Sequence, residues 1–502
     1  MSSIIKIIAI LLVFVTQSFG ATYYIDWVAG NDANNGTSKA TPWKRHPYML
    51  SEAVTYTHAA GDRFIFKGGV TWPGSCFTMS VTVGGSGANW DYYGVDRTWY
   101  NGGSWTRPIF DSEMTDRSIL FIGQIANTYW DALEFINASN SPSIDVVCPS
   151  PCVMSNLYIH KWYHYNVEGA HGGIYNNMFG GDTSQTMTNW LITHCDIGNP
   201  DGDNNSGVCL RGPGEVAFSK LHDAPELILH GGWSVHDTEF YNPTESFLGD
   251  AVQHPNLHYQ DAPNSYNGAV WTGPILWYNN YVHDIRGPGM PLLYIEPANA
   301  GLLPPTRHIY VYNNVFLNTL SAPLLPDNER NGGANFFDTN LIYIHVFNNT
   351  LECTSESTAV IDNRNRGLGS SNFASLTITN NHFINPVSGA NYGDSTLFDT
   401  ITLGNHLKQT LAQANTAGYY RSEFYAPTNA GASIIGAGAN LQSTYSFLPG
   451  ASKDTSMGGL RTPVDRPASG AWDIGAFAFN GEPPPPSGGG YTNTVWNLRV
   501  LP

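Results

Sequence analysis

The sequence has few charged residues and few long apolar runs. Asp, Glu, Lys and Arg together make up 13% of the 502 residues, well below the share usual in helical bundles and coiled coils. After residue 20, no stretch approaches the roughly 18 uninterrupted apolar residues that a membrane helix needs. Gly, Asn, Thr and aromatic residues are abundant instead, which favours a turn-rich β structure without membrane insertion.

Basic residues are scarcer than acidic ones. With 23 Lys and Arg against 40 Asp and Glu, the formal net charge is -17. This balance argues against nucleic acid or an anionic membrane surface as the partner. An acidic polysaccharide is a possible partner only where a local basic groove or bridging cations offset the repulsion.

Cysteine is also rare, and its spacing excludes one kind of metal site. The six cysteines form no CxxC…CxxC pattern, so a structural zinc site of that type is disfavoured. In an exported protein they permit disulfides. Cys148 with Cys152 and Cys195 with Cys209 are the candidate local pairs, and spacing alone does not establish connectivity.

The N-terminus has the pattern of a secretory signal peptide. Lys6 precedes an apolar run over residues 7–15, and Ser18-Phe19-Gly20 places small residues before a cut at Ala21. We therefore expect a secreted or cell-surface protein. The predicted organisation is a signal peptide over 1–20, one domain over 21–480, and a Pro/Gly linker with a short tail over 481–502.

A short motif with an Asn pair returns along the chain. YNNYVHD, YNNVFLN, FNNTLEC and TNNHFIN place their first Asn at residues 279, 313, 348 and 380, at intervals of 34, 35 and 32 residues. ITHCDIGN, VHDTEFYN and YIHKWYHYN extend the column to His194, His236 and His160, with longer intervals of 42 and 43 residues among them. Such periodicity indicates stacked copies of one unit.

The unit has the character of β-strands. Its apolar and polar residues alternate in short runs separated by Gly, Asn and Pro, which lack the period of a helix pair. We predict an all-β fold, a single-stranded right-handed parallel β-helix over roughly residues 60 to 390, with the Asn pairs hydrogen-bonded between coils. The longer intervals are assigned to loops at DGDNNSGVCLRGPG and QHPNLHYQDAPNSYNG.

Both ends of such a solenoid need caps. HPYMLSEAVTYTHAAGD is interpreted as an amphipathic N-terminal helix before a first strand at 63–67. A second helix is expected from about 406 to 415. Beyond it we expect an irregular C-terminal cap.

Several segments resemble one family group. ATYYIDWVAGNDANNGTSKATPW and GDRFIFKGGVTW are similar to the opening, and ASIIGAGAN and DRPASGAWDIGAFAF to the ending, of exported right-handed β-helix proteins of the polysaccharide lyase (pectate lyase-like) superfamily. The resemblance implies a β-helix that acts on a polysaccharide. The Asn-Ser-Asp-Asp-Gly-type calcium and catalytic cluster of one pectate lyase branch does not occur here, and its catalytic Lys has no counterpart.

A column of polar residues is the predicted site, because a solenoid binds ligands along equivalent positions of successive coils. Seventeen residues after four of the markers stand the candidate catalytic residues Arg211, Glu296 and Arg330 and the candidate binding residue Gln253. Neighbouring polar residues extend the column: Asp250 as a further catalytic candidate, and His254, Asp327, Glu329, Asp362 and Arg364 as substrate-binding candidates.

Two chemistries fit this column. In β-elimination a base removes the proton beside a uronate carboxyl group that Arg or a metal must neutralise. Arg211, Arg330 or Arg364 could neutralise it, with a Ca²⁺ ion held by the carboxylates Asp250, Glu296 and Asp327. Hydrolysis needs two carboxyl groups, which Asp250 and Glu296 could supply.

Elimination is favoured over hydrolysis by the family resemblance. The alternative outside enzymes is a noncatalytic surface protein that binds glycan or assembles through its coil ends. A merely solvated surface would explain each charged residue singly.

Overall fold

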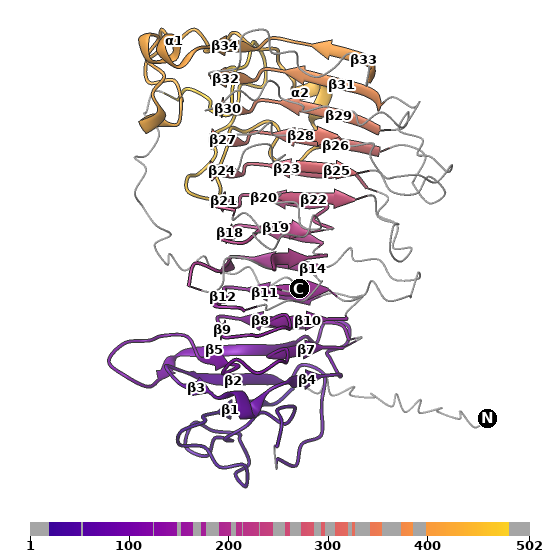
Figure 1. Cartoon of the computed structure of the whole chain (residues 1–502), viewed down its shortest axis with the longest axis vertical. Coiled ribbons are helices and arrows are strands. Elements are labelled where there is room, and N and C mark those ends of the chain that lie inside the picture. Colours follow the sequence, from indigo (N-terminus) through magenta and orange to yellow (C-terminus); the bar gives the residue numbers. More distant parts are fainter. Residues whose placement is uncertain are drawn as a thin grey trace, which may run out of the picture.

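The structure is a computed structural model that describes residues 20–51, 54–123, 125–147, 152–163, 172–176, 190–201, 207–212, 214–229, 231–243, 257–261, 273–285, 293–296, 307–319, 324–326, 342–353, 373–384 and 398–480. In these ranges the chain winds as a right-handed parallel β-helix, whose coils stack along one long axis (Figure 1). The predicted fold class is therefore confirmed.

Three parallel sheets form the walls of the solenoid. Sheet A has 13 described strands, ordered as follows: β1 (Thr22–Ile25), β2 (Arg63–Gly68), β5 (Asp91–Tyr100), β8 (Thr128–Asp131), β11 (Cys152–Ser155), β14 (Trp190–Thr193), β17 (Glu215–Ala217), β20 (Ser234–His236), β23 (Ile275–Tyr278), β26 (Arg307–Tyr312), β29 (Ile342–Phe347), β31 (Phe373–Thr379) and β33 (Phe398–Leu403).

Sheet B has 12 described strands: β3 (Thr71–Trp72), β6 (Ile109–Asp111), β9 (Glu134–Ile136), β12 (Tyr158–His160), β15 (Asp196–Gly198), β18 (Lys220–His222), β21 (Glu239–Tyr241), β24 (Tyr281–Ile285), β27 (Val315–Thr319), β30 (Thr350–Cys353), β32 (His382–Ile384) and β34 (Leu407–Gln409). Sheet C has nine: β4 (Met79–Val81), β7 (Leu120–Ile122), β10 (Ile144–Val146), β13 (Ile174–Asn176), β16 (Val208–Arg211), β19 (Glu226–Leu229), β22 (His258–Asp261), β25 (Leu293–Glu296) and β28 (Leu324–Pro326).

Alternation along each strand separates the core from the surface. In β10 the flanking Ile144 and Val146 are completely buried, whereas Asp145 between them is half-buried. Because successive side chains of a strand point to opposite faces, the residues of one parity fill the interior and those of the other parity line the outside. The short apolar runs of the sequence are thus enough to build one continuous core along the axis.

The Asn pairs have two different structural roles. The first Asn of each pair has a positive φ, between 52° and 59°, and makes the tight turn from sheet A to sheet B. The second Asn is buried, and in the first three of the four pairs its backbone N–H donates to the side-chain oxygen of the Asn on the next coil at 2.9 to 3.0 Å. The ladder consists of Asn280, Asn314, Asn349 and Asn381. The predicted hydrogen bonding between coils is confirmed.

One long interval in the repeat contains a whole additional coil. Between the turn residues His194 and Asp237, Phe218 makes a third turn with a φ of 49°, and β17, β18 and β19 form complete strands. The assignment of this interval to a loop at DGDNNSGVCLRGPG is therefore wrong. The repeat motif does not reveal the extra coil because that coil has no Asn pair, and the hydroxyl of Ser219 takes the ladder position instead.

Two of the three His assigned to the turn column lie beside it. Asn156, with a φ of 55°, makes the turn expected at His160, which belongs to β12. His236 precedes the turn residue Asp237 by one position. His194 does occupy the turn, with a φ of 55°.

The caps differ from the predicted helices. At the N-terminus, residues 46–51 and 54–60 contain turns and extended chain without a helix, and Tyr56 packs edge-on against Phe64 at 5.6 Å between ring centroids. At the C-terminus, β34 occupies part of the predicted helix, and α1 spans Leu411–Thr416. Thr410 starts α1 through a capping box with Gln413, which prevents the helix from extending backwards.

The segment after α1 runs back along the last coils (Figure 1). It includes the short 3-10 turn η6 (Arg421–Glu423) and the helix α2 (Gln442–Tyr445). Another 3-10 turn of the described chain, η1 (Gly74–Cys76), lies near the N-terminus, between β3 and β4. The first Asn of the pairs holds the C-terminal segment, since Asn313 donates to the carbonyl of Lys453 at 2.9 Å and Asn380 to that of Ala439 at 2.8 Å. Neither these helices nor any other in the described ranges has the length and apolar character to cross a bilayer.

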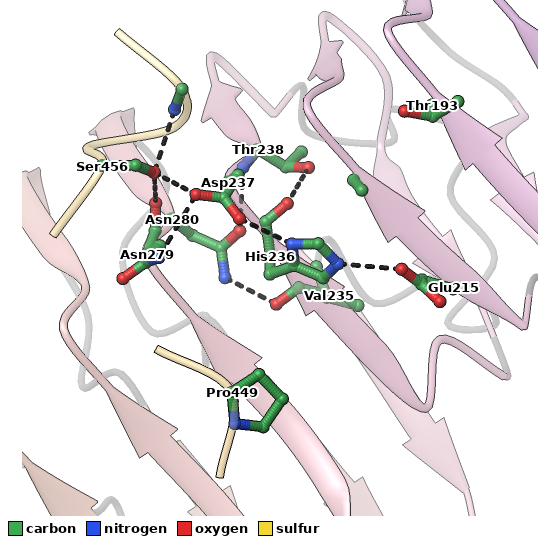
Figure 2. Close-up of polar contacts among 12 residues, drawn as sticks. Thr193, Glu215, Val235, His236, Asp237, Thr238, Asn279, Asn280, Pro449 and Ser456 are labelled. Carbon is green, nitrogen blue, oxygen red and sulfur yellow. Dashed lines mark hydrogen bonds and ion pairs between the residues drawn. The ribbon is translucent and has the colours of Figure 1, made fainter. Parts of the chain in front are cut away.

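The C-terminal segment also contacts the coils next to an ion-paired histidine, His236 (Figure 2). His236 lies between two carboxylates, with Nδ1 2.6 Å from Asp237 and Nε2 3.0 Å from Glu215 on the preceding coil. The Ser456 hydroxyl of the C-terminal segment donates to the other oxygen of Asp237, which Asn279 also contacts at 3.2 Å. One polar cluster thus joins three successive coils and the returning chain.

The same arrangement recurs twice on sheet B. His222 lies between Asp223, at 2.6 Å, and Asp196 of the preceding coil, at 2.9 Å. His283 contacts Asp284 in the same way, as well as Glu239 of the preceding coil at 3.2 Å. In each case the Asp directly follows the His and has a positive φ, so a local His-Asp pair is bonded to an acid one coil away.

These histidines make stability depend on pH above neutrality. Burial alone would lower the pKa of His236, but its hydrogen bonds to Asp237 and Glu215 outweigh burial and raise the pKa to about 9, and His222 behaves alike with Asp196 and Asp223. A folded-state pKa raised above the unfolded 6.5 gives stability that is present below 6.5 and lost as pH rises through about 9.

We expect the free energy of unfolding to fall by about 1 kcal/mol per histidine between pH 7 and 8.5. Denaturant unfolding at a series of pH values measures this. His236→Gln should be less stable at pH 7 and should show a shallower fall. An equal pH slope in wild type and variant would contradict the prediction.

The predicted disulfide between Cys195 and Cys209 does not form. Both are buried free thiols, and their Sγ atoms contact different carbonyls, Thr193 at 3.4 Å and Ile197 at 3.3 Å. Both side chains belong to the hydrophobic core. Cys148 lies outside the described residues, as do the signal peptide over 1–19 and the tail over 481–502.

Candidate functional site

One row of outward residues on sheet C combines an acid, a phenol and a cation. Backbone register pairs Phe121 with Asp145, Asp145 with Tyr175, and Tyr175 with Arg211, on four successive coils. We call these four residues the outer row. Since neighbouring strands are about 4.8 Å apart, the row places its side chains at a regular spacing along the outside of the solenoid.

Asp145 is a carboxyl group without a partner. Its Oδ1 atom is buried and has no hydrogen-bond partner. Its neighbours along the row are the aromatic residues Phe121 and Tyr175, and burial raises its pKa from 3.8 to about 6. Buried polar groups in proteins are nearly always hydrogen-bonded, so this group requires an explanation.

Tyr175 and Arg211 form a unit at the other end of the row. The guanidinium carbon of Arg211 lies 4.5 Å from the centre of the Tyr175 ring, and its Nη1 donates to the Tyr175 hydroxyl oxygen. Arg211 is half-buried at the end of β16, where the preceding Leu210 faces the core. Contact with an aromatic face and a hydroxyl holds the cation above the coil of Tyr175.

The structure places only part of the predicted column. Arg211 is described in full, and Glu296 is the last residue of β25. Asp250, Gln253, His254, Asp327, Glu329, Arg330, Asp362 and Arg364 lie outside the described residues.

The two described positions of that column are not equivalent. Following the register from Arg211 leads through Leu229 and Tyr259 to Tyr294, whereas Glu296 pairs with Asp261. Glu296 is thus three strands from Arg211 and displaced by two residues. The common offset from the repeat marker fails because the chain between the turn and the sheet C strand differs in length from coil to coil: Tyr294, in register with Arg211, stands 15 residues after Asn279 (294 − 279), whereas Arg211 stands 17 after His194 (211 − 194).

Asp145 and Tyr175 were not singled out from the sequence. The signal for Asp145 was a charge between the apolar residues of SIDVV, at the outward position of a short strand. Tyr175 stands in GGIYNN, whose Asn pair falls out of register with the repeat. Placing both residues beside Arg211 requires the pairing of strands that are 30 or more residues apart.

A second polar surface, on sheet B, is internally paired. Lys220 contacts Glu239 at 3.1 Å, and Glu239 also contacts His283. Since each charge there is balanced by a neighbour on the adjacent coil, the arrangement suits cohesion between coils. Within the described ranges, His, Cys, Asp and Glu do not gather in a group of three or more that is suited to a metal ion.

Comparison with known proteins finds likeness in structure alone. No family model matches the chain, and no curated protein matches it. Among solved structures, the pectate lyase Pel9A aligns with 92% of this chain and 97% of its own, at 14% identity and a TM-score of 0.42. A rhamnogalacturonan lyase aligns with 77% of this chain and 87% of its own, at 12% identity and a TM-score of 0.35.

A third solved structure belongs to a different enzyme class. The GH136 lacto-N-biosidase from Eubacterium ramulus aligns with 78% of this chain and 68% of its own, at 10% identity and a TM-score of 0.35. The activity of this chain therefore has to be argued from its own residues.

Proposed function

We propose that the protein is an exported enzyme that cleaves an acidic polysaccharide by β-elimination on the outer face of sheet C. The observation that carries the proposal is the Arg211 guanidinium held on that face by Tyr175. In a chain with a net charge of -17, a positioned cation on the outside of the solenoid is the group that an anionic sugar can bind. The resemblance of the chain's two ends to β-helix polysaccharide lyases supports the same substrate class.

The composition of the outer row favours elimination over hydrolysis. Hydrolysis requires two carboxyl groups on either side of the scissile bond, and the outer row contains one, Asp145. Elimination requires one base together with a positive group that stabilises the negative charge developing on the uronate carboxyl. The row supplies a carboxyl and a guanidinium, which is the second combination.

The residues predicted from the repeat extend this proposal to further coils. Asp250, Glu296 and Asp327 are proposed to hold a Ca²⁺ ion that bridges the protein to substrate carboxylates. Arg330 is proposed to neutralise a further carboxylate of the substrate. The remaining predicted residues are proposed to bind further sugar units: Gln253, His254, Glu329, Asp362 and Arg364.

Incubation of the purified protein with a polysaccharide panel tests the function. New reducing ends together with ultraviolet absorbance of unsaturated products, from a uronate-containing glycan, are the expected result. Reducing ends without that absorbance would identify a hydrolase, and binding without products would identify a noncatalytic glycan-binding protein.

A chelator tests the proposed calcium ion. In chelator, activity should vanish and return on addition of calcium; full activity in chelator would mean that the arginines alone neutralise the substrate carboxylates.

A further inference from the structure

Among the titratable groups of the described chain, Asp145 stands out because no hydrogen bond or ion pair offsets the burial of its carboxyl group. The buried histidines His222 and His236 have carboxylate partners, and the buried Arg466 donates to several carbonyl groups, among them that of Ala476 at 3.0 Å. Asp145 has neither an ion pair nor a hydrogen bond, although its Oδ1 is buried. Retaining an unpartnered carboxyl lowers stability at neutral pH, because burial disfavours the charged form.

The register of sheet C places Asp145 beside the residues of the proposed substrate site. It stands next to Tyr175 in the register of sheet C, and Arg211 is one coil further on. The Arg211 side chain lies over the Tyr175 ring, which brings its charge to the coil adjacent to Asp145. The backbone positions of Asp145 and Arg211 are therefore two coil spacings apart, about 10 Å, with Tyr175 between them.

Such a separation suits two groups that act on one sugar unit lying between them, one on its carboxylate and the other on the carbon beside it. A uronate carboxylate bound to Arg211 would present the carbon beside it, with its hydrogen, towards the coil of Asp145. A carboxylate that accepts no protein hydrogen bond keeps its lone pairs available for a proton from substrate. Its raised pKa, about 6, also makes it a stronger base than an ordinary Asp while it stays ionised above that pH.

We propose that Asp145 is the catalytic base of the site, an inference that rests on the proposed elimination activity. The Asp145 carboxylate takes the proton from the carbon beside the uronate carboxyl group. The electron pair of that bond forms a carbon–carbon double bond as the next carbon loses its bond to the glycosidic oxygen. The departing oxygen takes a proton from water, and the hydroxide formed recovers the proton from Asp145.

Asp145→Asn tests the assignment because it keeps the shape of the side chain and removes the base. We expect kcat to fall by about a hundredfold or more, while KM for the glycan found in the panel changes little, since Arg211 is intact. The wild-type kcat/KM should rise with pH through about 6, and Asp145→Asn should lack this limb. The unfolding midpoint of Asp145→Asn at pH 7.5 should equal or exceed that of wild type.

The matched control is Asp465→Asn, which removes an exposed carboxylate of the C-terminal segment and should leave turnover and its pH profile unchanged. If wild type and Asp145→Asn show equal kcat and the same acid limb, the assignment of Asp145 is overturned while the elimination activity stands. If wild type forms no unsaturated product from any glycan of the panel, the proposed function itself fails, and the assignment with it.

Discussion

Asn349→Ala is expected to lower the free energy of unfolding by about 4 kcal/mol, because it leaves several buried groups without partners. The Asn349 side-chain oxygen accepts from the backbone N–H and the side-chain amide of Asn314, at 3.0 and 2.9 Å. Its amide donates to the carbonyl of Val311 and to the side-chain oxygen of Asn381, both at 2.9 Å. Water cannot replace these bonds without opening the coil, because Asn349 is fully buried.

Chemical denaturation of wild type and variant measures this loss. Asn415→Ala is the matched control, since Asn415 is exposed in α1, and its replacement should change the free energy of unfolding by no more than about 0.5 kcal/mol. A loss below about 1 kcal/mol for Asn349→Ala would mean that core packing, and not the ladder, holds these coils in register.

Arg211→Ala is expected to reduce kcat/KM for the glycan by about a hundredfold, the effect usual when one charge-stabilising donor is removed from an active site. The guanidinium would no longer neutralise the uronate carboxyl, so both binding and proton removal become harder. Arg211→Lys should recover part of the loss, because it restores the charge without the fixed geometry over Tyr175. Glu296→Ala is likewise expected to fold and to lose binding or turnover.

Steady-state kinetics on the substrate from the panel provide the measurement, and secretion yield with circular dichroism reports folding. Arg117→Ala removes an equal charge from an exposed position and should have wild-type activity. Wild-type turnover in both Arg211→Ala and Glu296→Ala would show that the site lies on another face of the solenoid.

Local pattern was enough to predict the architecture. Alternating strands, turn residues and Asn pairs at a steady interval all act within one coil, and each of them indicates the same repeating unit, one coil of the β-helix. The ladder was predictable because a buried Asn beside a tight turn can satisfy the coil next to it. Prediction failed where a coil lacked the marker: Phe218 turns the chain without an Asn, and one whole coil was counted as a loop.

The caps were harder to predict because their conformation depends on distant contacts. The segment HPYMLSEAVTYTHAAGD has the spacing of an amphipathic helix, yet Tyr56 packs on Phe64 and its hydroxyl donates to Asp62 at 2.5 Å, in an extended chain. Tertiary contacts of this kind override the weak helical preference of a short segment. The returning C-terminal segment likewise depends on acceptors and donors more than a hundred residues away.

The sequence by itself determined the parallel β-helix, because strand alternation and turn chemistry are properties of neighbouring residues. The tertiary structure alone decided which outward residues share a row. Asp145, Tyr175 and Arg211 are brought together by the register of β10, β13 and β16, and that register depends on the lengths of the intervening loops and on the fit of each coil to the next. A shift of one residue in any strand would turn these side chains into the core, so the site exists only as a consequence of stacking.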